Sequence, residues 1–215
     1  MKEREPLFST KNLKLLRDPL NDSNPITVQV LGICSALAVT VKLKPSVVMA
    51  ISVIAVMAVS NVVISLLRKS IPPRIRIIVQ LTVIATMVIL VDEILQAFAY
   101  DVSKQLSVFV GLIITNCIIM GRLEAFALAN KPWPSFLDGV GNAAGYGVIL
   151  IIVAFFRELL GSGTVWGYPL FEKLGLFTTG YENNGLMILP PMALITVGII
   201  IWIQRAKNKK LIEEN

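Results

Sequence analysis

Six long apolar segments occupy most of this 215-residue chain, and they constrain its fold more than any other feature. A helix needs about 20 apolar residues to cross the ~30 Å hydrocarbon core of a bilayer. Inside that core, every backbone polar group must be bonded within the protein, which leaves helices as the simplest solution. We therefore predict an all-α integral membrane protein with six transmembrane helices, at residues 25–41, 46–67, 75–98, 105–121, 143–160 and 186–204.

The composition agrees with this prediction. Hydrophobic residues make up 55% of the chain and charged residues only 16%, whereas soluble domains carry about 25% charged residues. The net charge of +6 indicates basic loops rather than nucleic-acid binding. If the N-terminus is cytoplasmic, all but five of the 20 lysines and arginines lie on the cytoplasmic side, the five being Lys42, Lys44, Lys104, Arg157 and Lys173. The positive-inside rule then predicts that both termini are cytoplasmic.

The chain divides into a cytoplasmic N-terminal segment at 1–24, a six-span membrane domain at 25–204 and a cytoplasmic tail at 205–215. In the N-terminal segment, Leu13, Leu16 and Leu20 share one helical face beside basic residues. This pattern is typical of a short helix that lies on the membrane surface.

Two pairs of residues mark expected boundaries. Asn24 followed by Pro25 predicts the start of the first transmembrane helix, because asparagine caps helices and proline suits their first turn. Pro132 and Pro134 predict a loop before the fifth span.

The only two cysteines, Cys34 and Cys117, lie in the first and fourth spans. This spacing predicts two three-helix repeats, at about 25–100 and 105–204, and an odd number of spans makes the second repeat inverted. Gly32 and Gly121 interrupt the same two spans. Short spans interrupted by glycine at matching positions indicate discontinuous helices. We expect half-helices that meet near the membrane centre, each presenting a cysteine.

The residues alone leave three interpretations of the cysteines open. Each can be an inert small apolar residue, since free cysteine often is. They can form a disulfide, which a reducing compartment disfavours. They can bind zinc, copper(I) or an iron–sulfur cluster through soft thiolates. Because the chain has no histidine, a four-ligand metal site would need further ligands from a second chain.

Asp92 and Glu93 are carboxylates late in the third span. They are either solvated at the end of the helix or part of a cation path. The second possibility supports an alternative function, a stand-alone ion carrier built from inverted repeats.

Other polar residues in the spans have ordinary explanations. Arg157 and Glu158 are expected to form a local ion pair beside a glycine-rich loop. Asn61 and Asn116 are expected to make hydrogen bonds between helices, and Asn116 could also orient a cluster sulfur because it precedes Cys117. The sequence contains no phosphate-binding loop or dinucleotide fingerprint, so we do not expect this chain alone to bind NADH.

Four stretches resemble the family that includes the D-type subunits of the sodium-translocating NADH:quinone oxidoreductase (Nqr) and the E-type subunits of the Rnf ferredoxin:NAD oxidoreductase. They are NPITVQVLGICSALAVT, IPPRIRIIVQ, VGLIITNCIIMGRLEAFALA and DGVGNAAGYG followed by FRELLGSGT. Ser35 after the first cysteine favours the quinone-reductase branch over the Rnf branch.

The resemblance implies a translocase subunit of the bacterial inner membrane that is not catalytic alone. It implies a homologous six-span partner, the E-type subunit of the same complex, and further subunits A, B, C and F, which hold the flavins and bind NADH. It also implies a 2Fe-2S iron–sulfur cluster shared between the two homologous subunits. Carried over by position, the ligands from this chain are Cys34 and Cys117. Electrons would pass through this cluster on their way to ubiquinone, coupled to Na⁺ export.

Overall fold

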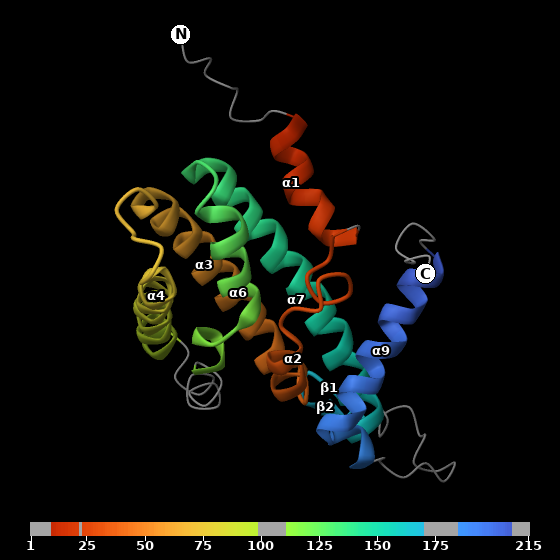
Figure 1. Ribbon diagram of the computed structural model, residues 1–215. Helices are drawn as coiled ribbons and strands as arrows, with labels where there is room; N and C mark the ends of the chain where they lie inside the picture. The colour runs from red at the N-terminus through yellow and green to blue at the C-terminus, as the bar shows by residue number, and fades with distance from the viewer. Residues whose placement is uncertain (1–9, 22, 99–110, 170–184, 208–215) are drawn as a thin grey trace, which may run out of the picture.

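The computed structural model of the protein describes residues 10–21, 23–98, 111–169 and 185–207 (Figure 1). Residues 1–9, 105–110 and 208–215, which include parts of the predicted N-terminal segment, fourth span and tail, lie outside the described residues. The elements in chain order are α1 (Thr10–Asn21), α2 (Ile33–Val39), α3 (Leu43–Leu67), α4 (Arg76–Phe98), α6 (Cys117–Arg122), the π-helix η1 (Leu123–Ala127), α7 (Pro132–Ser162), β1 (Thr164–Val165), β2 (Tyr168–Pro169), the 3₁₀-helix η3 (Gly185–Ile188) and α9 (Pro190–Lys207).

The long helices α3 and α7 pack side by side and antiparallel at the centre of the molecule (Figure 1). Glycines on α7 allow the two backbones to approach closely. A Cβ added to Gly139 would lie 3.2 Å from the Met57 carbonyl oxygen, and one added to Gly147 would lie 3.0 Å from Ala50 Cβ. Small residues of this kind are typical of helix interfaces in membranes, where close van der Waals packing stabilises association.

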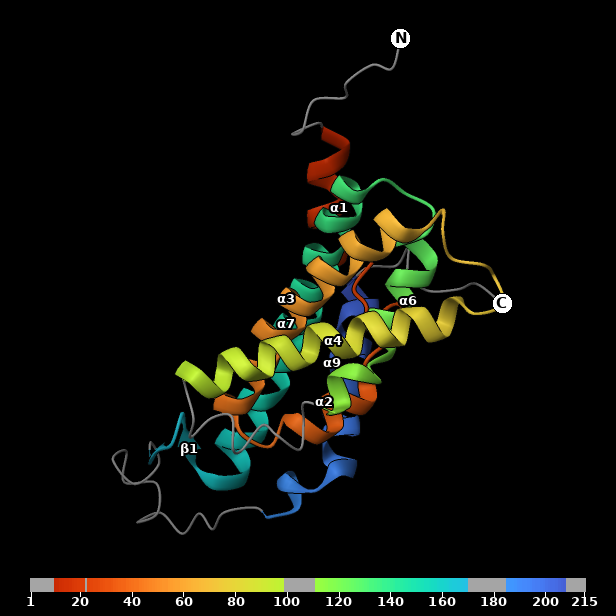
Figure 2. The same ribbon diagram turned by 90° about the vertical axis from the view of Figure 1, so that its left-hand side faces the viewer.

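The remaining helices flank this central pair. Helix α4 packs on α3, and α9 packs on α2, η3 and α7 on the opposite flank (Figures 1 and 2). The outward faces of α4 and α9 are apolar and exposed, and they include Ile78, Ile89, Ile94, Leu194, Ile195 and Trp202. Exposed apolar faces of this extent are expected of helices that contact lipid or other membrane subunits.

Three of the described helices, α3, α4 and α7, are long and apolar enough to cross a membrane, and Pro190–Ala206 in α9 is a shorter apolar helix. The prediction of a helical, multi-pass membrane protein is therefore confirmed. The full count of six spans and the repeat architecture stay predictions, because the first and fourth segments are not continuous helices in the described residues.

The prediction of a helix that starts at Pro25 is wrong, because residues 23–32 form a series of turns. The Asn24 side chain accepts hydrogen bonds from the backbone N–H groups of Ile26 and Thr27 and so caps the first turn. The chain then adopts positive φ angles at Val30 (58°) and Gly32 (80°). A right-handed helix cannot pass through residues in the left-handed region.

The predicted loop at Pro132 and Pro134 is also wrong, because both prolines lie in the first turn of α7. Proline is tolerated there because the first N–H groups of a helix have no partner within the helix. The fifth helix therefore begins well before residue 143. Prolines and polar residues before position 143 suggested a loop in the sequence. In the structure, Ser135 and Asp138 are buried in contacts with neighbouring elements rather than solvated.

Helix α1 is the short helix expected before the first span, and it packs along α7 rather than standing apart from the bundle (Figure 1). Gly141 and Gly145 of α7 form the contact. A Cβ on Gly141 would lie 2.7 Å from the Leu15 carbonyl oxygen, and one on Gly145 would lie even closer to the Pro19 carbonyl oxygen. Helix α1 thus lies in a groove that exists because these α7 positions have no side chain.

Candidate functional site

The first cysteine follows a sharp break in the backbone. Gly32 precedes α2 with φ 80° and ψ 12°, and Cys34 is the second residue of this helix. Glycine adopts this left-handed conformation at no steric cost. The break therefore places Cys34 at the beginning of a short helix, with its side chain exposed.

The second cysteine follows a second break. Residues 111–114 are helical, the chain turns at Thr115, and α6 begins at Cys117. Asn116 is extended at the N-cap of α6, and its side-chain oxygen accepts a hydrogen bond from the backbone N–H of Ile118 at 3.4 Å. Cys117 is therefore the first residue of its helix, and its side chain is also exposed.

The two breaks meet in space, although 85 residues separate them in the sequence. The backbone N–H of Gly32 donates a hydrogen bond to Cys117 Sγ, with a nitrogen–sulfur distance of 2.9 Å. The fold thus places Gly32 against both Asn116 and Cys117, and Cys34 follows Gly32 by two residues. Neither thiol is in a disulfide.

Buried polar side chains lie behind the cysteines. Ser35 Oγ donates to the Gly32 carbonyl oxygen at 2.9 Å, lies 2.7 Å from the Tyr146 hydroxyl, and accepts from Asn116 Nδ2 at 3.3 Å. Since a serine hydroxyl has one hydrogen, which goes to Gly32, the Tyr146 hydroxyl must be the donor to Ser35. Tyr146 comes from α7, so this network joins both breaks to the central helix pair.

The donor set fits part of a metal centre rather than a whole one. No group of three or more histidine, cysteine or acidic side chains able to hold a metal is present among the described residues. Two exposed thiols supply two of the four ligands that zinc sites and iron–sulfur clusters use. A backbone N–H aimed at sulfur is also a feature that favours bound thiolate over an inert thiol.

The carboxylates predicted as a possible cation path lie elsewhere. Asp92 and Glu93 are near the end of α4, which packs on α3 and presents an exposed outer face. Asp92 accepts a hydrogen bond from Gln96 of the same helix at 3.0 Å. The structure does not bring these two carboxylates together with the cysteines.

The predicted ion pair between Arg157 and Glu158 is wrong. Consecutive residues on a helix point about 100° apart, so the two side chains reach different partners. Glu158 accepts from the Leu43 N–H at the start of α3 and from the Gly167 N–H after β1. The Arg157 guanidinium is buried and donates five hydrogen bonds, to Thr40 Oγ1 and to the carbonyl oxygens of Leu37, Met187, Ile188 and Leu189.

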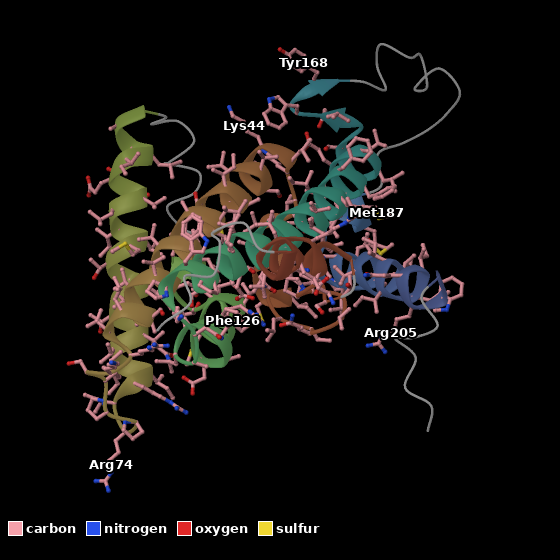
Figure 3. The ribbon with its side chains drawn as sticks, turned by 90° about the horizontal axis from the view of Figure 1, so that it is seen from above. Lys44, Arg74, Phe126, Tyr168, Met187 and Arg205 are labelled. Atoms are coloured by element: carbon pink, nitrogen blue, oxygen red, sulfur yellow. The ribbon has the colours of Figure 1, made fainter. Side chains whose placement is uncertain are left out.

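Arg157 therefore ties three elements together. It bonds the end of α2 to the segment that leads into α9, and Figure 3 shows Met187 where this segment lies beside α7. Every one of its acceptors is uncharged, and a guanidinium with its fixed fork of donors suits several carbonyl oxygens at once.

Two features in and near the site were not predicted from the sequence. Tyr146 is fully buried behind Gly32, yet in the sequence it resembles an ordinary aromatic residue of an apolar helix. Arg122 of α6 and the buried Asp138 of α7 form an ion pair between the two helices. In the sequence, the only signal for this pair was that Arg122 and Asp138 lie on either side of the loop predicted at Pro132 and Pro134.

The prediction that Asn61 bonds another helix is confirmed, since its Nδ2 donates to the Ser135 carbonyl oxygen.

Comparisons with known proteins point to one family. The family model described as "Rnf-Nqr subunit, membrane protein" matches residues 12–201. A protein of Aeromonas hydrophila, named as the D-type subunit of Na(+)-translocating NADH-quinone reductase, is 56% identical over 93% of this chain and 95% of its own length. Proteins of the same name from Photobacterium profundum and Pasteurella multocida are 57% and 55% identical over 91% and 97% of this chain, and 93% and 100% of theirs.

Proposed function

The chain belongs to the Rnf-Nqr family of membrane-protein subunits, and from this premise we propose that it acts as the D-type subunit of a sodium-translocating NADH:quinone oxidoreductase. The relatives that share more than half of its residues over nearly its full length carry that name. The role is that of one component of a translocase that couples electron transfer to ubiquinone with Na⁺ export. The corresponding role in an Rnf complex is the alternative within the same family.

One observation supports a redox role. The two backbone breaks that precede the cysteines lie in contact, because the Gly32 N–H donates a hydrogen bond to Cys117 Sγ. We propose that Cys34 and Cys117 hold two positions of a 2Fe-2S cluster. When bound, such a cluster would take up and pass on one electron at a time. The residues of this chain would fix the two thiolates, and the Gly32 N–H would stabilise negative charge on one sulfur.

The other two ligands must come from a partner. Both thiols are exposed in this chain, so a partner can reach them. A homologous six-span partner, the E-type subunit, with two cysteines of its own, would complete the ligand set and cover the thiols. Subunits A, B, C and F of the complex would supply the flavins and the NADH site.

The proposed location is the bacterial inner membrane, with both termini cytoplasmic. Arg74, from a loop assigned to the cytoplasm, lies at the opposite end of the molecule from Lys44 and Tyr168 (Figure 3). This separation agrees with a chain that spans the bilayer along α3 and α7. Trp166, between β1 and β2, and Tyr168, in β2, are both exposed, which suits a membrane–water interface.

The test replaces each cysteine by alanine in the whole complex, in separate variants. Iron and acid-labile sulfide are measured per complex, together with electron transfer from NADH to quinone. We expect each variant to assemble and to lose one 2Fe-2S equivalent. A matched control is Ser60→Ala, because the Ser60 hydroxyl is buried, has no hydrogen-bond partner among the described residues and belongs to α3. Full iron content and activity in both cysteine variants would show that the proposal is wrong.

A further inference from the structure

The polar network behind the cysteines is closed and almost fully shielded. The exposed fractions of Tyr146, Ser35 and Asn116 are 0%, 3% and 4%. Every hydrogen bond in it leads to one of the two breaks: Tyr146 to Ser35, Ser35 to the Gly32 carbonyl, and Asn116 to both Ser35 and the Ile118 N–H. Buried polar groups retained in an apolar protein need such partners, and a fully bonded network is rigid.

The ring of Tyr146 also touches the first break directly. A Cβ added to Gly32 would lie 2.9 Å from Tyr146 Cε2 and 3.2 Å from Cδ2, so the ring closes the space beside the glycine. Gly32 is thus held on two sides, by the ring and by the Ser35 bond to its carbonyl oxygen. Both constraints act on the residue whose N–H points at Cys117 Sγ.

We propose that Tyr146 is a positioning residue for the redox centre. Its ring closes the space beside Gly32, and its hydroxyl bonds Ser35, which holds the Gly32 carbonyl oxygen. Together these contacts restrict the φ and ψ angles of Gly32 and thereby hold the preceding peptide, whose N–H bonds Cys117 Sγ. Through Ser35 and Asn116 it locks the two breaks to α7 as one unit. This inference rests on the proposed function, because it concerns the thiolates that would hold the cluster.

The consequence is a defined effect on reduction potential. Hydrogen bonds to cluster sulfurs stabilise the more negatively charged, reduced state and so raise the potential. Tyr146→Phe keeps the ring but removes the donor to Ser35, which frees Ser35 to reorient and loosens the φ and ψ angles of Gly32. We therefore expect a cluster that is still bound but has a lower reduction potential. A tenfold change in the one-electron equilibrium corresponds to about 59 mV, and we expect a shift smaller than this.

The experiment uses the complete complex with Tyr146→Phe, and it measures iron, acid-labile sulfide and the potential of the cluster by redox titration followed by electron paramagnetic resonance. The matched control is Tyr168→Phe, because Tyr168 is 69% exposed and lies outside the network. Ser35→Ala, which removes the middle of the network, should shift the potential in the same direction. It replaces Tyr146→Phe as the test if that variant fails to assemble.

The expected result is wild-type iron content, a lowered potential in Tyr146→Phe and Ser35→Ala, and an unchanged potential in Tyr168→Phe. An unchanged potential and unchanged resonance spectrum in both network variants would overturn the positioning role. That failure is distinct from failure of the proposed function, because the Cys34→Ala and Cys117→Ala complexes report separately on whether this chain holds the cluster at all.

Discussion

A methyl group at Gly32 is the smallest change that challenges the geometry of the cysteine site. The variant Gly32→Ala has two separate costs. The φ angle of 80° lies in the left-handed region, which costs an L-residue about 1–2 kcal/mol. The new Cβ would also lie 2.9 Å from the Tyr146 ring and 3.5 Å from Asn116 Oδ1. Overpacking of this kind costs about 1–3 kcal/mol, so the expected total is about 2–5 kcal/mol.

Gly167 separates these two costs. It has nearly the same φ angle, 83°, but nothing lies within 4 Å of the position its Cβ would take. Gly167→Ala should therefore carry only the backbone cost, about 1–2 kcal/mol. The difference between the two variants measures the clash with the network behind the cysteines.

The assay heats the purified complex, with a fluorescent protein fused to this chain, and measures by size exclusion the fraction that stays assembled. We expect Gly32→Ala to lose assembly at a lower temperature than Gly167→Ala and to contain less iron. Adding Tyr146→Ala should recover part of the loss in Gly32→Ala, since removing the ring opens space for the methyl group. Equal stability of the two single variants, or no coupling with Tyr146→Ala, would refute the account of crowding at this break.

Three further predictions concern the elements around the site. Arg157→Met should cost at least about 3 kcal/mol, because each buried acceptor left without a donor costs about 1–3 kcal/mol, and a lower yield of assembled complex will report it. Arg122→Ala should be more damaging than the double variant Arg122→Ala with Asp138→Asn, because the single change leaves a buried carboxylate unpaired at a cost of about 3–5 kcal/mol; equal thermal stability of the two would contradict this. Gly141→Leu should displace α1 from α7 and expose its backbone to trypsin, whereas Gly198→Leu, at a position with open space, should leave the digestion pattern unchanged.

The second and third spans could be predicted closely from the sequence. They are continuous apolar runs, and the observed helices Leu43–Leu67 and Arg76–Phe98 differ from the predicted limits by only a few residues. Hydropathy alone is sufficient there, because a long apolar run in a membrane has no stable alternative to a helix.

The first span could be predicted only in part. Gly32, two residues before Cys34, correctly indicated a break, but hydropathy does not report backbone dihedral angles, so the turns after Asn24 were missed. The start of α7 was missed for the opposite reason. Its first turns contain two prolines and the polar residues Ser135 and Asp138, and only tertiary contacts make these polar residues compatible with burial.

The sequence predicts the members of the proposed cysteine site but not the residues that support it. Similar depth in the first and fourth predicted spans suggested pairing Cys34 with Cys117, and Gly32 and Asn116 were chosen because they lie close to these cysteines in the sequence. Tyr146 could not be found this way, because its contact with Gly32 joins residues far apart in the sequence. Sequence spacing likewise suggested a pair of Arg157 and Glu158, which the direction of side chains on a helix excludes.

The anchoring of residues 23–32 has a consequence for the order of events during synthesis. Asn24 Nδ2 donates to the Gly145 carbonyl oxygen, 121 residues later in the chain, and Gly32 donates to a sulfur 85 residues later. While the ribosome is still making the first half, the first break has neither partner. Its final shape must therefore wait until α7 has entered the membrane, because contacts between distant residues form only once both exist. Maturation of the proposed redox centre would then be a late step, and a chain truncated after α4 is expected to expose an unformed Cys34 site to the quality-control proteases of the cell.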